Sequence, residues 1–274
     1  MGSSAIDNAG EWAIRQSILA YGLRLGIRTN RPEFMDRLSQ HFPPLWKPSS
    51  ASSVERMFSV RIGGDGSSNG KRAIHEMFED LERGEKSRSL NAVLEDLERR
   101  MKMYVAEMAR RRVFVHAGVV GWKGKAIIVP GRSLSGKTTL IAEMVRAGAT
   151  YYSDEYAVLD MNGLVHPYPQ LLQVREPGSG KQKKRRPEEI GGVTGTKPLP
   201  VGLVAVSPYR AGARWRPRRL STGQAVLELL ANTVPARRRP EVVMPTLHSA
   251  VTDAIVLKGA RGEADRVARL ILEN

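Results

Sequence analysis

The chain has 274 residues and a formal net charge of +15, and its length suits one large domain or two small ones. It contains no cysteine, which excludes disulfide scaffolds, zinc ribbons, iron–sulfur sites and thiol nucleophiles. No stretch approaches the roughly 20 apolar residues that span a bilayer, and residues 1–12 lack the basic-then-apolar order of a signal peptide. We therefore expect a cytoplasmic protein with no membrane partner.

Residues 1–110 predict an N-terminal α+β region. Residues 10–30 fit either a helix or a strand, and residues 31–40 have a helical pattern. Residues 54–62 alternate between apolar and polar side chains, as in a strand. Apolar residues recur at three- and four-residue steps from 89 to 110, which predicts an amphipathic helix leading into the second part of the chain. The sequence leaves open whether this region is a separate domain or packs onto the sheet of the second part.

Residues 111–274 alternate strand-like and helix-like patterns, which predicts an α/β fold. Strands are expected at 113–120, 126–129, 149–160 with a polar break, 200–207 and 251–258. Helices are expected after residue 136, after Ser221 as a helix cap, and at 262–273. Residues 176–199 are rich in glycine, proline and lysine and almost lack apolar side chains, so we expect a mobile loop there.

Most of the positive charge lies in this second part. Three clusters carry it: Lys181, Lys183, Lys184, Arg185 and Arg186; Arg210, Arg214, Arg216, Arg218 and Arg219; and Arg237, Arg238 and Arg239. Such clusters favour an anionic partner, which could be a nucleotide, an acidic protein or a nucleic acid. The alternative is a solvated basic surface, because charge alone carries no specificity.

A glycine-rich motif stands between an apolar strand and a helical pattern. Gly131, Gly136, Lys137 and Thr138 complete G-x-x-x-x-G-K-[ST]. In such a loop the backbone N–H groups point into one concavity and the helix N-terminus adds partial positive charge, so the loop binds phosphate. Lys137 would reach the β- and γ-phosphates, and the Thr138 hydroxyl would ligate magnesium. The alternative is a glycine-rich turn before a helix. We expect a nucleotide to contact Gly131, Arg132, Ser133, Leu134, Ser135, Gly136, Lys137, Thr138 and Thr139.

Three further residues are candidates for phosphoryl-transfer chemistry. Asp154 and Glu155 form an acidic pair at a predicted strand break. One carboxylate could accept the proton of an attacking hydroxyl while the other holds magnesium, whereas a solvated surface turn is the alternative. His116 lies on an apolar strand, where it is either a core residue or a neighbour of the γ-phosphate.

The stretch from Phe114 to Asp160 resembles the catalytic domain of HPr kinase/phosphorylase. It is still more similar to the HPr-kinase-like proteins of bacterial gene clusters, including those that make modified peptides such as lasso peptides. The shared order is a histidine–small-residue strand, a short hairpin, the phosphate loop with its helix, and an acidic pair. The resemblance implies a P-loop kinase domain on a mixed sheet, as in HPr kinase and ATP-dependent phosphoenolpyruvate carboxykinase.

The same resemblance implies ATP and Mg²⁺ as cofactors and a homo-oligomer, since the relatives assemble. It also implies an active site lined by His116, Lys137, Thr138, Asp154 and Glu155. Asp154 takes the role of general base, and Thr138 and Glu155 support magnesium.

The firm match covers residues 113–175, and a weaker one runs through residues 200–256. Glu155 stands where the true HPr kinase has aspartate, and the glutamate that follows the loop hydroxyl there is missing. Arg175 lies near the place of that enzyme's arginine–glycine signature and is a candidate anion contact. The N-terminal part does not resemble the sensor domain. The resemblance therefore implies a kinase-like fold and an ATP site, but neither HPr as the substrate nor the reverse phosphorylase activity.

The leading hypothesis is a kinase that uses Mg-ATP to phosphorylate a hydroxyl, most simply a serine of a small protein or peptide. The lysines of residues 176–199 suit an acidic acceptor. A nucleotide-binding scaffold with little turnover is the second hypothesis, because two acidic residues of the true enzyme are missing. A nucleic-acid-binding ATPase is the third. We do not expect nucleic acid as a partner, since only Tyr209 and Trp215 interleave with the arginine cluster at 210–219 and stacking needs more aromatic residues.

Overall fold

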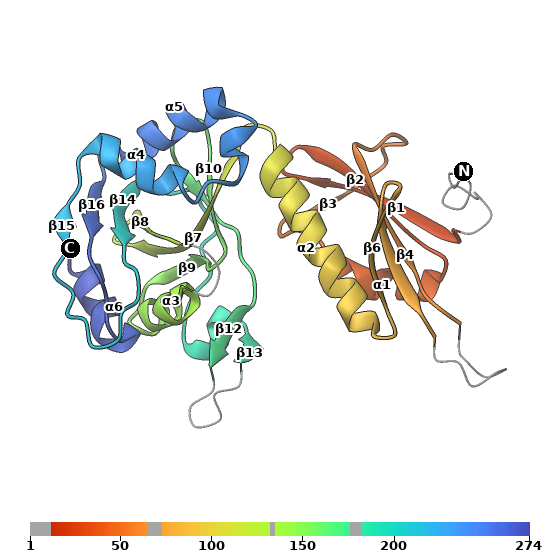
Figure 1. Ribbon diagram of the computed structural model, residues 1–274, viewed down its shortest axis with the longest axis horizontal. Coiled ribbons are helices and arrows are strands. Elements are labelled where there is room, and N and C mark those ends of the chain that lie inside the picture. Colours follow the sequence, from red (N-terminus) through yellow and green to blue (C-terminus); the bar gives the residue numbers. More distant parts are fainter. Residues whose placement is uncertain (1–11, 65–72, 132–134, 176–181) are drawn as a thin grey trace. The chain divides into compact units, whose positions relative to one another are not determined.

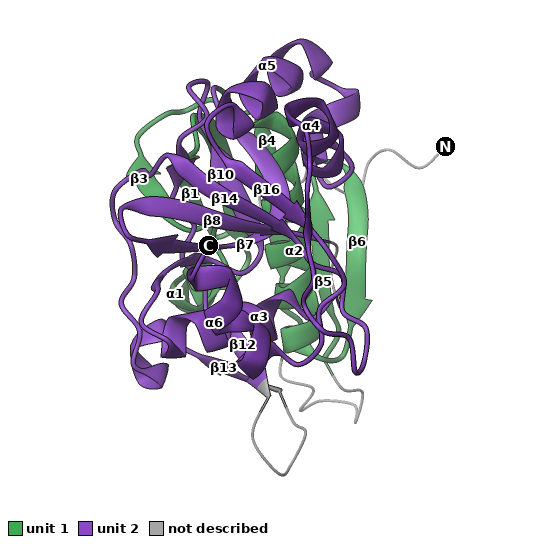
Figure 2. Ribbon diagram, turned by 90° about the vertical axis from the view of Figure 1, so that its left-hand side faces the viewer, with its two compact units in different colours: residues 1–110 green, residues 111–274 purple. Residues whose placement is uncertain are grey.

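The computed structural model describes residues 12–64, 73–131, 135–175 and 182–274 (Figure 1). The chain divides into two compact units, residues 1–110 and residues 111–274 (Figure 2). Both units combine helices with a sheet that contains parallel and antiparallel strand pairs. The predicted α/β class is therefore confirmed. Within the described ranges, no helix has both the length and the apolar character needed to cross a membrane.

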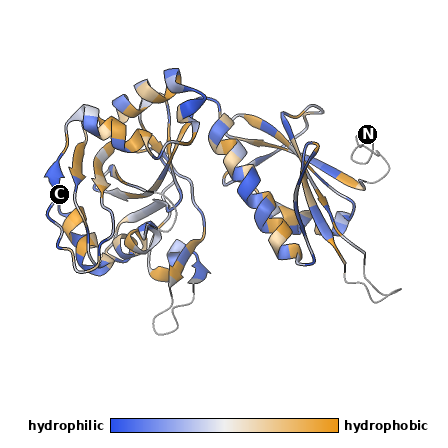
Figure 3. Ribbon diagram, in the orientation of Figure 1, coloured by the Kyte–Doolittle hydropathy of each residue, from blue (hydrophilic) through white to orange (hydrophobic). Residues whose placement is uncertain are grey.

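Unit 1 contains a six-stranded sheet in the order β3-β1-β2-β4-β5-β6. Its elements are β1 (Ile14–Ala20), β2 (Leu23–Thr29), η1 (Pro32–Phe34), α1 (Met35–Ser39), β3 (Lys47–Ser49), β4 (Arg56–Arg61), β5 (His75–Glu79), β6 (Glu82–Ser87) and α2 (Leu90–Met108). The helix expected at 89–110 is α2, whose first turn is capped by the Ser89 hydroxyl. Hydrophobic and hydrophilic residues alternate along it (Figure 3), and its apolar side packs on the sheet. Residues 14–29 form an antiparallel strand pair, which resolves the choice between helix and strand.

Unit 2 contains an eight-stranded sheet in the order β11-β10-β7-β8-β14-β16-β15, with β9 also paired to β7. Its strands are β7 (Val113–Trp122), β8 (Lys125–Pro130), β9 (Thr150–Ser153), β10 (Tyr156–Leu159), β11 (Val165–His166), β12 (Leu172–Arg175), β13 (Gln182–Arg185), β14 (Val201–Val206), β15 (Arg218–Arg219) and β16 (Ile255–Lys258). Its helices are α3 (Lys137–Arg146), η2 (Pro187–Ile190), α4 (Thr222–Leu230), η3 (Val234–Arg237), α5 (Pro240–Val251) and α6 (Ala264–Leu272). Strands β12 and β13 form a separate two-stranded sheet.

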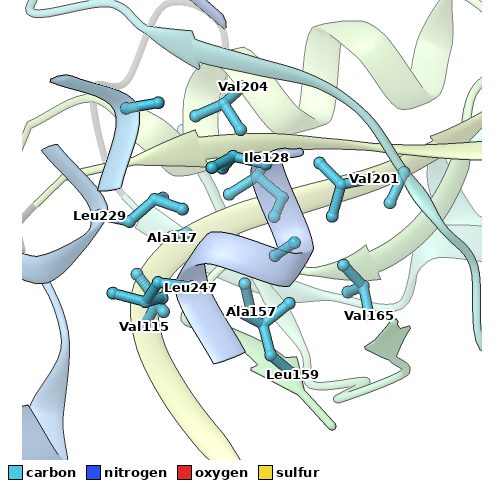
Figure 4. Close-up of a cluster of buried hydrophobic side chains, with 14 of the residues drawn as sticks. Val115, Ala117, Ile128, Ala157, Leu159, Val165, Val201, Val204, Leu229 and Leu247 are labelled. Carbon is cyan, nitrogen blue, oxygen red and sulfur yellow. The ribbon is translucent and has the colours of Figure 1, made fainter. Parts of the chain in front are cut away.

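The sheet of unit 2 lies between two helical layers. Helices α4 and α5 pack on one face through a cluster that includes Val115, Ile128, Leu229 and Leu247 (Figure 4). Helices α3 and α6 pack on the other face with Val120, Ile127 and Val129. The three strands β8, β14 and β16 run parallel, so their carboxyl ends share one edge of the sheet. In open α/β sheets this edge is where ligands bind.

Two expectations for unit 2 differ in part from the structure. The segment expected to be a mobile loop at 176–199 contains regular structure from residue 182 on, because β13 pairs with β12, η2 follows, and Thr194 bridges Tyr151. Backbone hydrogen bonds hold this stretch, and hydropathy does not report them. Residues 176–181 lie outside the described part of the chain. The strand expected at 251–258 begins only at Ile255, since α5 occupies the residues up to Val251.

Candidate active site

The glycine-rich loop joins β8 to α3 at the carboxyl edge of the sheet. The backbone N–H of Gly131 donates a 3.0 Å hydrogen bond to the carbonyl oxygen of His116 on β7, which fixes the start of the loop beside that strand. At its end, Gly136 caps α3 with φ of +77°, a left-handed conformation that favours glycine. Residues Arg132, Ser133 and Leu134 lie outside the described part of the chain. The predicted strand–loop–helix context of the motif is therefore present.

The two predicted motif side chains after Gly136 lie at different depths. Lys137 is only 9% exposed. Burial lowers the pKa of Lys137, and the negative charges of Asp154 and Glu155 oppose that shift. Thr138 is partly buried, and its hydroxyl donates a hydrogen bond to Asp154. Thr139 is exposed in the first turn of α3, so the structure places it outside this cluster.

Strand β7 brings the acidic pair next to the loop. Strands β9 and β10 both pair with β7, and the break between them contains Asp154 and Glu155. The backbone N–H of Ala117 on β7 donates to the carbonyl oxygen of Glu155 at 3.1 Å. On its other side, Ala117 is paired with Pro130, the last residue of β8. One residue of β7 thus separates the end of β8 from the acidic pair.

Asp154 is held by two hydroxyl groups. The Tyr151 hydroxyl donates to Asp154 Oδ1 at 2.9 Å, and Thr138 supplies the second hydrogen bond. Burial raises the pKa of Asp154, and the charge of Glu155 acts in the same direction, while both hydroxyl groups oppose them. The same burial raises the pKa of Tyr151, so its hydroxyl remains a proton donor. A carboxylate with a raised pKa is a stronger base than a solvated aspartate.

His116 lies between the loop and the acidic pair. Its ring packs against that of Tyr156, with 4.8 Å between the centroids. Burial lowers the pKa of His116, the charge of Lys137 lowers it further, and the charge of Glu155 opposes both. The imidazole is therefore held toward its neutral form, in which it can both donate and accept a hydrogen bond.

Arg175 ends β12, and its side chain is outside the described part, so its role as an anion contact stays a prediction.

Two other residues near the loop carry no signal in the sequence. Tyr151 reads as an ordinary apolar position of a strand. Arg261 follows β16 and donates from Nη2 to the carbonyl oxygen of Gly136 at 2.8 Å, although 125 positions separate the two residues. Only the tertiary structure brings them to the site.

The residues present fit a magnesium ion that is shared with a nucleotide. Thr138 offers a hydroxyl oxygen, and Glu155 offers a carboxylate in the break between β9 and β10. Within the described residues, no group of three or more histidine, aspartate or glutamate side chains could hold a metal ion. Magnesium is commonly bound by one or two carboxylates together with substrate phosphates, so such a group is not required.

Comparison with known proteins assigns no family to this site: no protein-family model and no curated protein matches the chain.

Proposed function

We propose that residues 111–274 form a P-loop kinase domain that binds Mg-ATP and transfers its γ-phosphoryl group to a hydroxyl of a small protein or peptide. One observation carries the proposal. The two chemically active side chains of the glycine motif, Lys137 and Thr138, interact with the acidic pair by charge and by a hydrogen bond. A glycine-rich turn without a ligand would give no reason to bury a lysine beside two carboxylates.

In the proposed reaction the loop amides and Lys137 bind the phosphates. Thr138 and Glu155 hold magnesium, which, when bound, neutralises charge on the phosphate oxygens. The Thr138 hydroxyl donates its hydrogen bond to Asp154, so its oxygen lone pairs are available to a cation.

Asp154 accepts the proton of the acceptor hydroxyl as the bond from that oxygen to phosphorus forms and the bond from phosphorus to ADP breaks. Such a base contributes about 10²–10⁴-fold to the rate. Neutral His116 donates to the transferring group or orients Asp154 in this proposal.

Calorimetric titration with Mg-ATP tests the binding half of the proposal. The wild-type protein should bind, and Lys137→Ala should weaken binding by roughly 10–150-fold, the equivalent of one hydrogen bond to a charged group. Lys125→Ala is the matched control, because Lys125 is an exposed lysine at the start of β8 in the same unit. Equal affinity of wild type and Lys137→Ala, or no binding by wild type, would overturn the proposal.

A further inference from the structure

We propose that Arg261 is a positioning residue for the glycine-rich loop, holding two of its peptide units so that their N–H groups face the bound phosphates. The inference rests on the proposed function, since it assigns a task within the same site. Its basis is the contact between the buried guanidinium and the loop backbone. Arg261 donates from Nη2 to the carbonyl oxygens of Ser135, at 3.2 Å, and Gly136, at 2.8 Å.

The orientation of the amides follows from peptide geometry. In a planar trans peptide unit the C=O and the N–H point in opposite directions. The Ser135 carbonyl shares its unit with the Gly136 N–H, and the Gly136 carbonyl shares its unit with the Lys137 N–H. Carbonyl groups directed at Arg261 therefore direct both N–H groups away from it. These N–H groups lie at the start of α3, where backbone donors lack helical partners and bind anions.

The structure holds the Arg261 side chain firmly. The residue is 2% exposed, and its backbone N–H donates to the carbonyl oxygen of Pro208 at 3.0 Å. Its guanidinium packs on the ring of Tyr209, 5.5 Å from the centroid, and the Tyr209 hydroxyl donates to Glu263 at 2.8 Å. The packing on Tyr209 thus helps to fix the guanidinium.

Gly136 is matched to this contact. A Cβ at this position would lie 2.7 Å from Arg261 Nη2, closer than real Cβ atoms approach a neighbour. Any other residue would push the guanidinium away from the carbonyl groups it binds. The glycine of the motif thus serves both the left-handed backbone conformation and the approach of Arg261.

Burial of the Arg261 charge destabilises the fold, which argues that this charge has a function. Within the described residues no carboxylate forms an ion pair with Arg261, and its Nε atom has no hydrogen-bond partner. Burial lowers the pKa of Arg261, as expected for a cation removed from water. The charge of Glu263 offsets this only in part, and a buried cation with no carboxylate in direct contact is disfavoured unless an anion benefits. The phosphates of a nucleotide above the loop are that anion.

Titration of Arg261→Met, Arg261→Lys and the control Arg266→Met with Mg-ATP and with inorganic tripolyphosphate tests the inference. Methionine suits the buried site, and Arg266 is an exposed arginine of α6. We expect Arg261→Met to lose affinity about 30-fold for both ligands, because the two charge-assisted hydrogen bonds that orient the phosphate-binding amides are lost. Arg261→Lys should lose less, and Arg266→Met should match wild type.

Unchanged affinity of a folded Arg261→Met variant would overturn the inference while leaving the proposed function intact. If circular dichroism shows that Arg261→Met does not fold, the Arg261→Lys variant tests the inference instead. Its Gly136 and Lys137 amide signals should shift in the ¹⁵N NMR spectrum and its affinity should fall, and wild-type values for both would overturn the inference. Absence of binding by wild type would instead refute the proposed function.

Discussion

Asp154 combines opposing influences within one side chain. Burial and the charge of Glu155 raise its pKa, while hydrogen bonds from Tyr151 and Thr138 lower it. The Tyr151 hydroxyl is therefore a means of adjusting the basicity of the proposed catalytic base without touching the nucleotide. This arrangement makes the acid side of the activity profile a direct measure of the environment of Asp154.

The Tyr151→Phe variant should shift that profile. Removing the hydroxyl removes an influence that lowers the pKa of Asp154, so the pKa rises and transfer is lost at a higher pH as the solution is acidified. The measurement is the rate of phosphoryl transfer against pH for wild type and Tyr151→Phe. A shift of the acid limb to lower pH, or no shift, would contradict the assignment of Asp154.

The Asp154→Asn variant should be more stable than wild type at neutral pH. The pKa of Asp154 is raised in the folded protein, so its favourable contribution is present at low pH and is lost as the pH rises through the folded-state pKa. Asparagine removes the buried charge and keeps an amide oxygen that can accept from the Tyr151 hydroxyl. We expect a gain of about 1 kcal/mol at pH 7 and little gain near pH 3, measured as thermal midpoints. A lower midpoint than wild type at pH 7 would contradict this reading.

For single residues, the sequence was sufficient to predict those within a motif but not the partners that they contact. Lys137, Thr138, Asp154 and Glu155 follow from spacing and resemblance, and the structure brings them together. Tyr151 and Arg261 could not be predicted in this way, because their contacts depend on strand pairing and on a chain reversal over more than a hundred residues. No local pattern reports such contacts.

Strand β7 and helix α3 are packed unusually closely, and this packing sets the position of the loop. A Cβ on Gly118 of β7 would lie 2.4 Å from Cγ1 of Ile141 on α3. Since α3 begins at the loop, the distance between this helix and the sheet also fixes the height of the loop above the acidic pair.

The Gly118→Ala variant should therefore lose both stability and nucleotide affinity. Overpacking of this kind costs about 1–3 kcal/mol, which chemical denaturation can measure. The matched control is Gly223→Ala in α4, where an added Cβ meets no atom within 4 Å and the helix gains up to about 1 kcal/mol. Equal stabilities of the two variants would refute the close-packing argument.

Elements with an apolar run were predictable, and elements held by charge or backbone pairing were not. The strands expected at 113–120, 126–129 and 200–207 are β7, β8 and β14, all in the core of unit 2. By contrast, β6 has the sequence ERGEKS and no apolar residue. It is held by pairing with β5 and by ion pairs from Arg83 and Lys86 to Glu76. Helix α5 contains Pro245, a residue that ordinarily argues against a helix interior.

The charge of the whole molecule is divided unevenly between its two units. In unit 1, arginines pair with carboxylates, as Arg61 does with Glu76 and Arg100 with Glu79. In unit 2, the exposed arginines of the cluster at 210–219 form no ion pair within the described residues. Long-range attraction of an anionic ligand or acceptor is therefore expected from unit 2.

Residues 111–274 expressed alone should fold and bind Mg-ATP. Every candidate site residue lies in this unit, which has its own sheet and two apolar clusters. We expect an affinity within about threefold of the full chain, a difference of under 1 kcal/mol, measured by calorimetry at equal ionic strength. A folded fragment that fails to bind would show that residues 1–110 contribute to the site.

The most direct test of the account is transfer of label from γ-labelled ATP, with magnesium, into the proteins and peptides of a lysate of the source organism. Wild type and Asp154→Asn are compared after calorimetry has established that both bind nucleotide. The account predicts a labelled species with wild type and a signal about 10²–10⁴-fold weaker with Asp154→Asn. Equal labelling by the two proteins, or nucleotide binding by wild type without any labelled species, would contradict it.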